Sequence, residues 1–157
     1  MAKKITVYII SILIPLAVGA LSAWLTMDGM KAFGDMAQPP LSPPMWLFPI
    51  VWTILYVLMG IGSARIFIKR SENKEAADAA LYIYALQLLM NFFWSIIFFN
   101  MREYLFAFIW LLMLLAAIII MIRQFYAVDK TAALLQLPYA AWVSFAGYLT
   151  LAIWLMQ

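Results

Sequence analysis

The chain contains no cysteine and no histidine, and charged residues occupy only 11% of its 157 positions. Disulfides, thiol nucleophiles, imidazole acid–base catalysis and the usual zinc ligand sets are therefore excluded. Apolar residues make up 68% of the chain, against about 45–50% in a soluble domain, which excludes a water-soluble globule. The net charge is only +3, and the basic residues lie beside apolar runs, so membrane topology explains them better than nucleic-acid binding.

Five apolar runs are each long enough to cross about 30 Å of hydrocarbon as a helix. They cover residues 5–25, 46–68, 79–99, 104–122 and 132–156, and a long loop at 26–45 separates the first two. The short alternating segments that are typical of membrane β-strands do not occur. The sequence therefore predicts one all-α domain over residues 1–157, an integral membrane bundle of five transmembrane helices.

The basic residues predict how this bundle is oriented. Two lysines precede the first run, as in a signal peptide, but that run is longer than the roughly 7–15 apolar residues of a signal sequence, so we expect it to stay as a span. Of the ten basic residues, only Lys31 and Arg102 fall on the side opposite the N-terminus. The positive-inside rule then places the N-terminus in the cytoplasm. This bias suits a bacterial cytoplasmic (inner) membrane.

The predicted membrane core lacks acidic side chains, since all seven fall in loops or at the ends of the runs. A proton pump or ion-coupled carrier keeps an ionisable group near mid-membrane. An ion-coupled pump is therefore disfavoured.

Amides are the polar groups that the core does contain. Gln87 and Asn91 lie one turn apart in the third run, and Trp94, Ser95 and Phe98 continue the same face. An amide that faced lipid would leave its hydrogen-bonding groups unmet, so this face must point into the bundle. The pattern leaves two interpretations open: the amides join neighbouring helices, or they help to bind a ligand.

Aromatic residues form faces in two other runs. The second run presents Phe48, Trp52 and Tyr56, and the fifth presents Tyr139, Trp142, Phe145 and Ala146. Trp24, Trp46 and Trp154 lie at the ends of runs, where tryptophan typically belongs to an interfacial belt. If the deeper aromatic faces converge toward the long loop, they form a flat-walled cavity suited to a planar apolar ligand. Ordinary core packing explains them as well.

The long loop carries a proline-rich segment, residues 39–44, which holds four of the seven prolines. Such a segment is stiff and donates few hydrogen bonds, so it is either a lid over the helix ends or an exposed linker. The preceding residues 27–36 predict a short amphipathic helix at the membrane surface. Gly60 and Ala64 form a small-xxx-small pair that permits close helix approach and argues only weakly for a dimer.

Three motifs, in order and in separate runs, carry a resemblance to a known family. They are Ser42-Pro43-Pro44-x-Trp46-x-Phe48-Pro49-x-x-Trp52-Thr53-x-Leu55-Tyr56-x-x-Met59-Gly60, Gln87-Leu88-x-x-Asn91-x-x-Trp94-Ser95-x-x-Phe98-Phe99 and Leu137-Pro138-Tyr139-x-x-Trp142-x-x-Phe145. Over its whole length the chain resembles the tryptophan-rich sensory protein and translocator protein family, formerly called the peripheral benzodiazepine receptor family, and in particular its bacterial members.

The resemblance implies a receptor-like membrane protein that binds protoporphyrin IX and similar flat hydrophobic ligands in a pocket under the first loop, sensing or regulating tetrapyrrole levels. It implies a homodimer, no required cofactor and no metal. The ligand-binding residues that it implies are Phe33, Trp46, Phe48, Trp52, Tyr56, Gln87, Asn91, Trp94, Trp142, Phe145 and Ala146. The alternatives are a light- and oxygen-dependent protoporphyrin-degrading enzyme, with Trp52 and Trp142 as catalytic residues, and a transporter of tetrapyrroles or lipids.

Two departures limit what the resemblance implies, and the composition limits which porphyrin is favoured. No basic residue follows Tyr148, so the C-terminal sterol-recognition pattern of animal members is incomplete. Leu41 stands where relatives often carry tryptophan, which weakens the expected loop contact. Without histidine or cysteine, only methionine or tyrosine could ligate haem iron, so a metal-free porphyrin is the favoured ligand.

Overall fold

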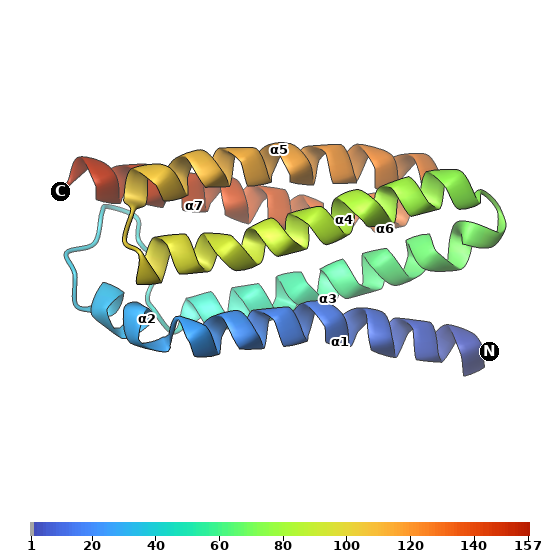
Figure 1. Cartoon of the computed structure of the whole chain (residues 1–157), viewed down its shortest axis with the longest axis horizontal. Helices are drawn as coiled ribbons and strands as arrows, with labels where there is room; N and C mark the ends of the chain where they lie inside the picture. The colour runs from blue at the N-terminus through green and yellow to red at the C-terminus, as the bar shows by residue number, and fades with distance from the viewer. Residues whose placement is uncertain (1) are drawn as a thin grey trace.

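The computed structural model describes residues 2–157, and five long apolar helices form its body (Figure 1). These are α1 (Ala2–Leu25), α3 (Leu47–Ile68), α4 (Lys74–Ser95), α5 (Tyr104–Val128) and α7 (Leu137–Leu155). Two short helices, α2 (Met27–Gly34) and α6 (Lys130–Leu134), connect them, and residues 2–157 contain no strand. The all-α prediction is confirmed, and the five helices are long and apolar enough to cross a membrane, as expected of an integral membrane protein.

The bundle has two different ends (Figure 1). The N-terminus, the α3–α4 turn and α6 lie at one end, which we call the basic end because most of the lysines and arginines are there. Helix α2, the proline-rich segment and the C-terminus lie at the other, which we call the loop end. The predicted amphipathic helix is confirmed as α2, although it ends at Gly34. The cytoplasmic location of the N-terminus stays a prediction.

Capping side chains set where several helices begin and end. Helix α4 starts before residue 79 because the Asn73 side chain accepts a hydrogen bond from the Ala76 N–H at 3.1 Å. Helix α5 continues past residue 122 and ends at Val128. The next residue, Asp129, is the N-cap of α6. The helices are therefore longer than their apolar runs, because polar residues at the bundle ends also adopt helical conformation.

The fifth apolar run, expected to be one span at residues 132–156, is divided into α6 and α7. Gln136 lies at the junction, and its backbone N–H donates to the Ala133 carbonyl three residues earlier. Pro138, which lacks an N–H, occupies the first turn of α7, where no intrahelical donor is required. This break turns the Gln136 side chain inward, and its Nε2 donates to the Leu58 carbonyl of α3 at 3.0 Å.

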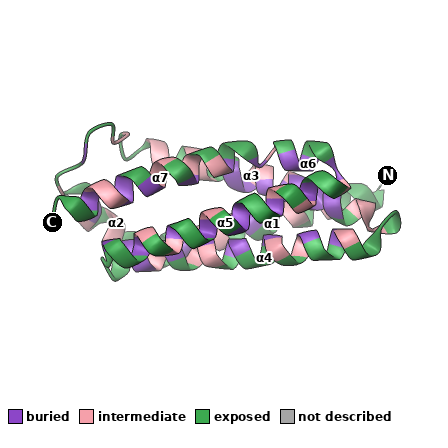
Figure 2. Ribbon diagram, turned by 90° about the horizontal axis from the view of Figure 1, so that it is seen from above, coloured by how far each residue is buried: buried purple, intermediate pink, exposed green. Residues whose placement is uncertain are grey.

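Helices α1 and α3 pack closely because glycines remove side chains from their contact. A Cβ atom at Gly60 would collide with the Ile12 backbone, and one at Gly19 would collide with the Tyr56 ring. Gly60 of the Gly60–Ala64 pair thus allows close packing against α1 of the same chain. The pair therefore does not support a homodimer, which stays a prediction. Buried residues lie on the faces that the helices turn toward one another (Figure 2).

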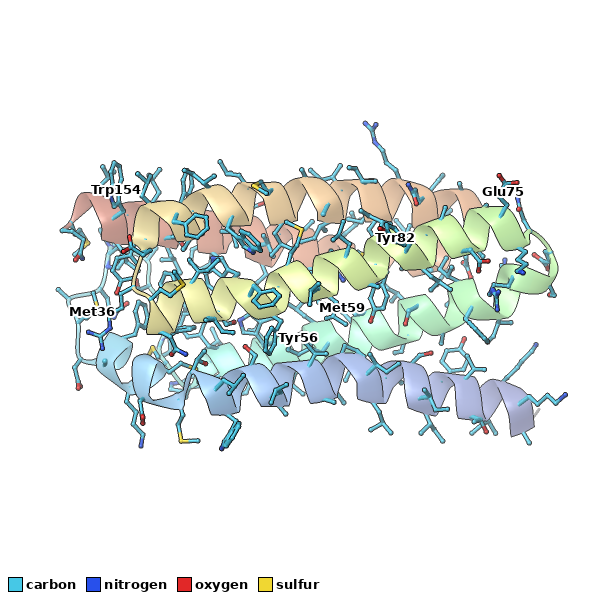
Figure 3. All side chains as sticks on the ribbon, in the orientation of Figure 1. Met36, Tyr56, Met59, Glu75, Tyr82 and Trp154 are labelled. Carbon is cyan, nitrogen blue, oxygen red and sulfur yellow. The ribbon has the colours of Figure 1, made fainter. Side chains whose placement is uncertain are left out.

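The two halves of the bundle are filled differently. Near the basic end the interior is closely packed, with Ile66, Ile118, Met121 and Phe125 completely buried. Tyr56 and Met59 lie inside the bundle at its middle, whereas Trp154 lies near the C-terminus (Figure 3). Between Tyr56 and the loop end, side chains leave a cavity.

Candidate functional site

A cavity of about 480 Å³ occupies the loop end, between α1, α2, α3, α4 and α7. Its volume is in the range of pockets that enclose small organic ligands. Eight of its 22 lining residues are aromatic: Phe33, Phe48, Trp52, Tyr56, Trp94, Phe98, Phe99 and Trp142. This is the cavity under the first loop that the sequence predicts.

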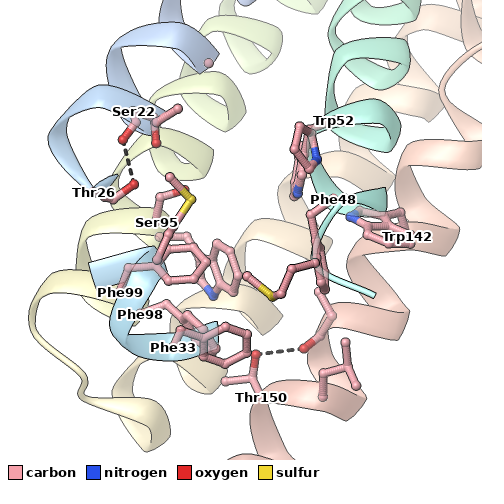
Figure 4. A pocket seen from close by; sticks show the side chains of 18 of the residues that line it. Ser22, Thr26, Phe33, Phe48, Trp52, Ser95, Phe98, Phe99, Trp142 and Thr150 are labelled. Carbon is pink, nitrogen blue, oxygen red and sulfur yellow. Dashed lines mark hydrogen bonds between the residues drawn. The ribbon is translucent and has the colours of Figure 1, made fainter. Parts of the chain in front are cut away.

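The rings stand in two groups on opposite sides of the cavity (Figure 4). On one side, Trp94 stacks on Phe98 with centroids 5.0 Å apart, and Phe33 of α2 meets the edge of Phe98 at 5.2 Å. On the other side, Phe48 of α3 contacts Trp142 of α7 at 5.8 Å. The space between two such walls suits a flat, apolar ligand.

A π-helical turn, η2 (Ile96–Asn100), ends the α4 segment and shapes one wall. The Met101 N–H bonds to the Ile96 carbonyl at 3.0 Å, five residues back. The wider turn aims Phe98 and Phe99, which are consecutive, into the same cavity. π-Bulges of this kind often occur at functional sites. Gly29 of α2 approaches the Phe99 carbonyl closely, so a larger residue there would push α2 away.

Hydrogen bonds between α3, α4 and α7 fix the floor of the cavity. The Tyr56 hydroxyl donates to Asn91 Oδ1 at 3.3 Å, and Asn91 Nδ2 donates to the Tyr139 hydroxyl at 2.8 Å. Tyr139 in turn donates to Gln87 Oε1 at 2.6 Å. Trp52 rests on this floor, with its ring 5.6 Å from Tyr56 and 6.3 Å from Tyr139. The buried amides thus hold the helices together and position the aromatic floor.

The long loop folds back over the helix ends. The Tyr148 hydroxyl of α7 donates to the Pro40 carbonyl at 2.7 Å, and Pro39 is buried. Gln38 Nε2 donates to the Phe33 carbonyl at 3.0 Å, which ties the loop to α2. The proline-rich segment is thus anchored to α7 rather than a free linker, which favours the lid interpretation, although the cavity is covered directly by Phe33 and Met45 on either side of residues 39–44.

The cavity lining is uncharged throughout the described residues, and its threonine hydroxyls already donate within the helices. Thr26, Thr53 and Thr150 each donate to the backbone carbonyl four residues earlier, at 2.7–2.8 Å (Figure 4 shows two of these). Trp94 differs: its side chain is 7% exposed, and its indole N–H is buried with no partner among residues 2–157. The nitrogen is enclosed in the ligand-free cavity wall, so a ligand acceptor would satisfy that donor once the neighbouring rings move aside.

A second polar feature lies at the basic end, away from the cavity. Arg65 Nε donates to Asp129 Oδ2 at 2.9 Å, and Asp129 Oδ1 also accepts the Thr131 N–H that starts α6. Burial raises the pKa of the Asp129 carboxyl, but hydrogen bonds from Arg65 and from the Ala132 backbone outweigh it, so the net pKa lies below its ordinary value. This pair ties α3 to the α5–α6 junction.

Seven of the eleven predicted ligand-binding residues line the cavity. They are Phe33, Phe48, Trp52, Tyr56, Trp94, Trp142 and Ala146. Asn91 lies behind Tyr56, and Gln87 lies beyond Tyr139, so both act on the cavity wall through a tyrosine. Phe145 packs between Trp142 and Tyr148 outside the lining. Trp46, the residue just before α3, is 66% exposed and lies off the cavity.

Sequence reasoning missed the whole contribution of α1. Gly19, Ala20, Ser22 and Ala23 line the cavity, but small residues in an apolar run give no signal that separates a ligand wall from a lipid face. Tyr139 was expected on an aromatic face, but not as the centre of the hydrogen-bonded floor. Its partners come from two other helices, and their proximity depends on helix order.

Sequence comparisons agree with this architecture. The profile of the TspO/MBR family matches residues 11–155. The chain is 35% identical to "Tryptophan-rich protein TspO" of Chlorobaculum tepidum over 98% of this chain and 97% of that protein. It is 33% identical to "Translocator protein" of Bos taurus, covering 90% and 85% of the two chains. It is 30% identical to "Tryptophan-rich sensory protein" of Cereibacter sphaeroides, covering 73% and 69%.

Proposed function

The chain is a member of the TspO/MBR family, and from this premise we propose that it is a membrane receptor for porphyrins. The ligand class is flat and hydrophobic, with metal-free protoporphyrin IX as the representative. The ligand occupies the cavity at the loop end, and its occupancy serves to sense or regulate tetrapyrrole levels. No cofactor and no metal ion is required for this role.

The single observation that carries the proposal is the pair of facing aromatic walls, one of which contains the unpartnered Trp94 N–H. Phe98 and Trp94 face Phe48 and Trp142 across the cavity, which suits a planar macrocycle. The unpartnered Trp94 N–H complements the propionate or carbonyl oxygens at the edge of such a ligand. The names of two relatives, a sensory protein and a translocator protein, agree with a receptor-like role.

Filling the cavity tests the proposal. Ala146 lines the cavity on α7, so Ala146→Leu occupies part of the ligand volume. We expect the affinity for protoporphyrin IX to fall by about tenfold or more, since overpacking costs about 1–3 kcal/mol. The measurement is quenching of tryptophan fluorescence in darkness, with protein in lipid nanodiscs.

The matched control is Ala141→Leu, also on α7 but exposed and outside the cavity lining. It adds the same side chain and should leave the affinity unchanged. Equal affinities of the two variants would contradict ligand binding in this cavity. Absence of saturable quenching in the native chain would overturn porphyrin binding altogether.

Light-driven breakdown of the bound porphyrin is a second candidate function. The observation that favours it is that Trp52 and Trp142 both line the cavity, where an electron-rich indole can donate to a photo-excited macrocycle. Illumination in the presence of oxygen should then bleach the porphyrin absorption band in the native chain. Bleaching that persists in the Trp52→Phe and Trp142→Phe variants would assign the reaction to the free dye and leave binding as the function.

We also propose that the protein lies in a bacterial cytoplasmic membrane, as a homodimer, with its N-terminus in the cytoplasm. The excess of basic residues at the basic end supports this orientation. The cavity would then open under the face that points away from the cytoplasm.

A further inference from the structure

The seam between α1 and α3 is lined by unusually small side chains where it passes the cavity. Helix α1 contributes Gly19, Ala20 and Ala23, and α3 contributes Pro49 and Thr53. All five line the cavity, and all except Gly19 are exposed to a molecule the size of water. The cavity is partly open, and small exposed residues that face one another on neighbouring helices mark the seam where it opens.

The helical register of α3 shows which way this opening faces. Pro49, Thr53, Tyr56 and Gly60 follow one face of α3, at spacings of three and four residues. Deeper in the bundle this face meets α1, because Tyr56 contacts Gly19 and Gly60 contacts Ile12. Toward the loop end the same face still points at α1. There the facing residues are too small to close the gap, so the seam opens outward between α1 and α3.

The opening lies at the depth of the lipid chains. Ala20 is five residues from the end of α1 at Leu25, which corresponds to about 7.5 Å along a helix. Thr53 is six residues from the start of α3 at Leu47, which corresponds to about 9 Å. Helices of 24 and 22 residues are about 36 and 33 Å long, so they extend beyond a core of about 30 Å by only about 2–3 Å at each end. Both depths exceed this overhang, so the opening faces hydrocarbon.

We propose that this seam is a lateral portal through which ligands dissolved in the bilayer reach the cavity, with Ala20 and Thr53 at its mouth. The proposal rests on the proposed function and adds the class of ligand: molecules that partition into the membrane before they bind. Access from the aqueous side is restricted by the lid, which Tyr148 and Gln38 hold in place through backbone carbonyls.

The absence of native cysteine allows a sharp test on folded protein. Ala20→Cys places a single thiol at the portal mouth, and Ala17→Cys places one at an exposed position on α1 outside the cavity lining. Each purified variant, in phosphatidylcholine nanodiscs, is modified with benzyl methanethiosulfonate, which adds a bulky apolar group as a disulfide. Stopped-flow tryptophan quenching then gives the association and dissociation rates of protoporphyrin IX.

Modification at position 20 is expected to slow both association and dissociation by about tenfold, because a barrier on the path affects both directions. Ala20 also borders the cavity, so the dissociation rate decides between the two effects: a benzyl group that only filled ligand volume would speed dissociation, whereas one that blocks the portal slows it. Reduction of the mixed disulfide should restore both rates. Modification at position 17 should change neither rate. Thr53→Cys, on the other side of the seam, should behave as Ala20→Cys does.

Two results would overturn the portal while leaving porphyrin binding intact. One is unchanged rates after modification at positions 20 and 53. The other is an association rate that follows the aqueous porphyrin concentration, instead of its mole fraction in the bilayer, when the lipid content is varied. Failure of the unmodified variants and the native chain to bind protoporphyrin IX would instead overturn the proposed function, and the portal with it.

Discussion

At the scale of single residues, the Trp94 indole is distinctive because its N–H is buried and unpartnered within residues 2–157. Trp94→Phe keeps an aromatic ring and removes the donor. We expect the affinity for protoporphyrin IX to fall by about two- to tenfold, corresponding to about 0.5–1.5 kcal/mol for one hydrogen bond. The measurement is an equilibrium titration in darkness.

Octaethylporphyrin provides the control ligand for this variant, because it carries no oxygen acceptor. Its affinity should be the same for the native chain and for Trp94→Phe. A similar loss for both porphyrins would show that Trp94 acts through the shape of its ring and not through its N–H.

Asp129 determines how the stability of the basic end depends on pH. Its pKa in the folded protein lies below the ordinary value, so the folded state binds this proton less readily than the unfolded state. The stabilisation that the ionised Asp129 carboxylate gives the folded state is therefore complete above the pKa that Asp129 has in the unfolded chain. It is lost as the pH falls below about 4, through the lower pKa that Asp129 has in the folded protein. A thermal melt in detergent, recorded from pH 7 down to pH 3, should show this loss.

Asp129→Asn keeps an oxygen for the α6 N-cap and removes the charge that pairs with Arg65. We expect its melting temperature to be lower at pH 7, by an amount equivalent to about 1.5–3 kcal/mol, and to change less on acidification. Asp78→Asn, in the exposed pair with Arg70, is the control and should cost much less. Parallel acid profiles for the native chain and Asp129→Asn would contradict this role.

At the scale of helices, Tyr139 joins α7 to α4 and, through Asn91, to α3. Tyr139→Phe leaves Asn91 Nδ2 and Gln87 Oε1 without this partner in a completely buried site. The expected loss is about 1–2 kcal/mol, smaller than for many soluble cores because polar groups also find partners in a membrane-unfolded state. Tyr82→Phe is the control, since Tyr82 is exposed on α4, and it should leave the melting temperature unchanged.

The inward face of α4 could be predicted from its sequence alone. Gln87 and Asn91 carry amides that lipid cannot satisfy, so their direction follows from hydrogen bonding. Their partners could not be predicted, because Tyr56 and Tyr139 are brought to them by the order of the helices in the bundle. The π-helical turn also gave no signal, since residues 96–100 contain neither proline nor glycine. Its two wall residues, Phe98 and Phe99, were therefore not among the predicted site residues, although Phe98 was expected on the inward face of the third run.

At the scale of the whole molecule, the fold class and the five helices follow from composition and run length, because the bilayer sets the length of each helix. The division of α6 from α7 shows what composition leaves undetermined. Gln136 occupies an apolar run, and its inward position depends on the Leu58 carbonyl and on the space beside Gly62, both in α3. Such a fit between distant segments appears only in three dimensions.

The orientation of the molecule in its membrane is open to a direct test. Lys3→Cys and Ala37→Cys place single thiols at the basic end and in the long loop, both at exposed positions. In intact cells, a membrane-impermeant maleimide should label Cys at position 37 and should reach position 3 only after lysis. The reverse pattern would place the N-terminus outside and would contradict the positive-inside prediction.

The cavity also makes the two halves of the bundle unequal in compressibility. The half near the basic end is close-packed around Phe125 and Ile66, whereas the loop end encloses about 480 Å³. Hydrostatic pressure favours states that eliminate internal voids. In the ligand-free protein the loop end is therefore more compressible than the basic end. Pressure should first draw the aromatic walls of the cavity together, and a bound ligand should lower the compressibility of the loop end.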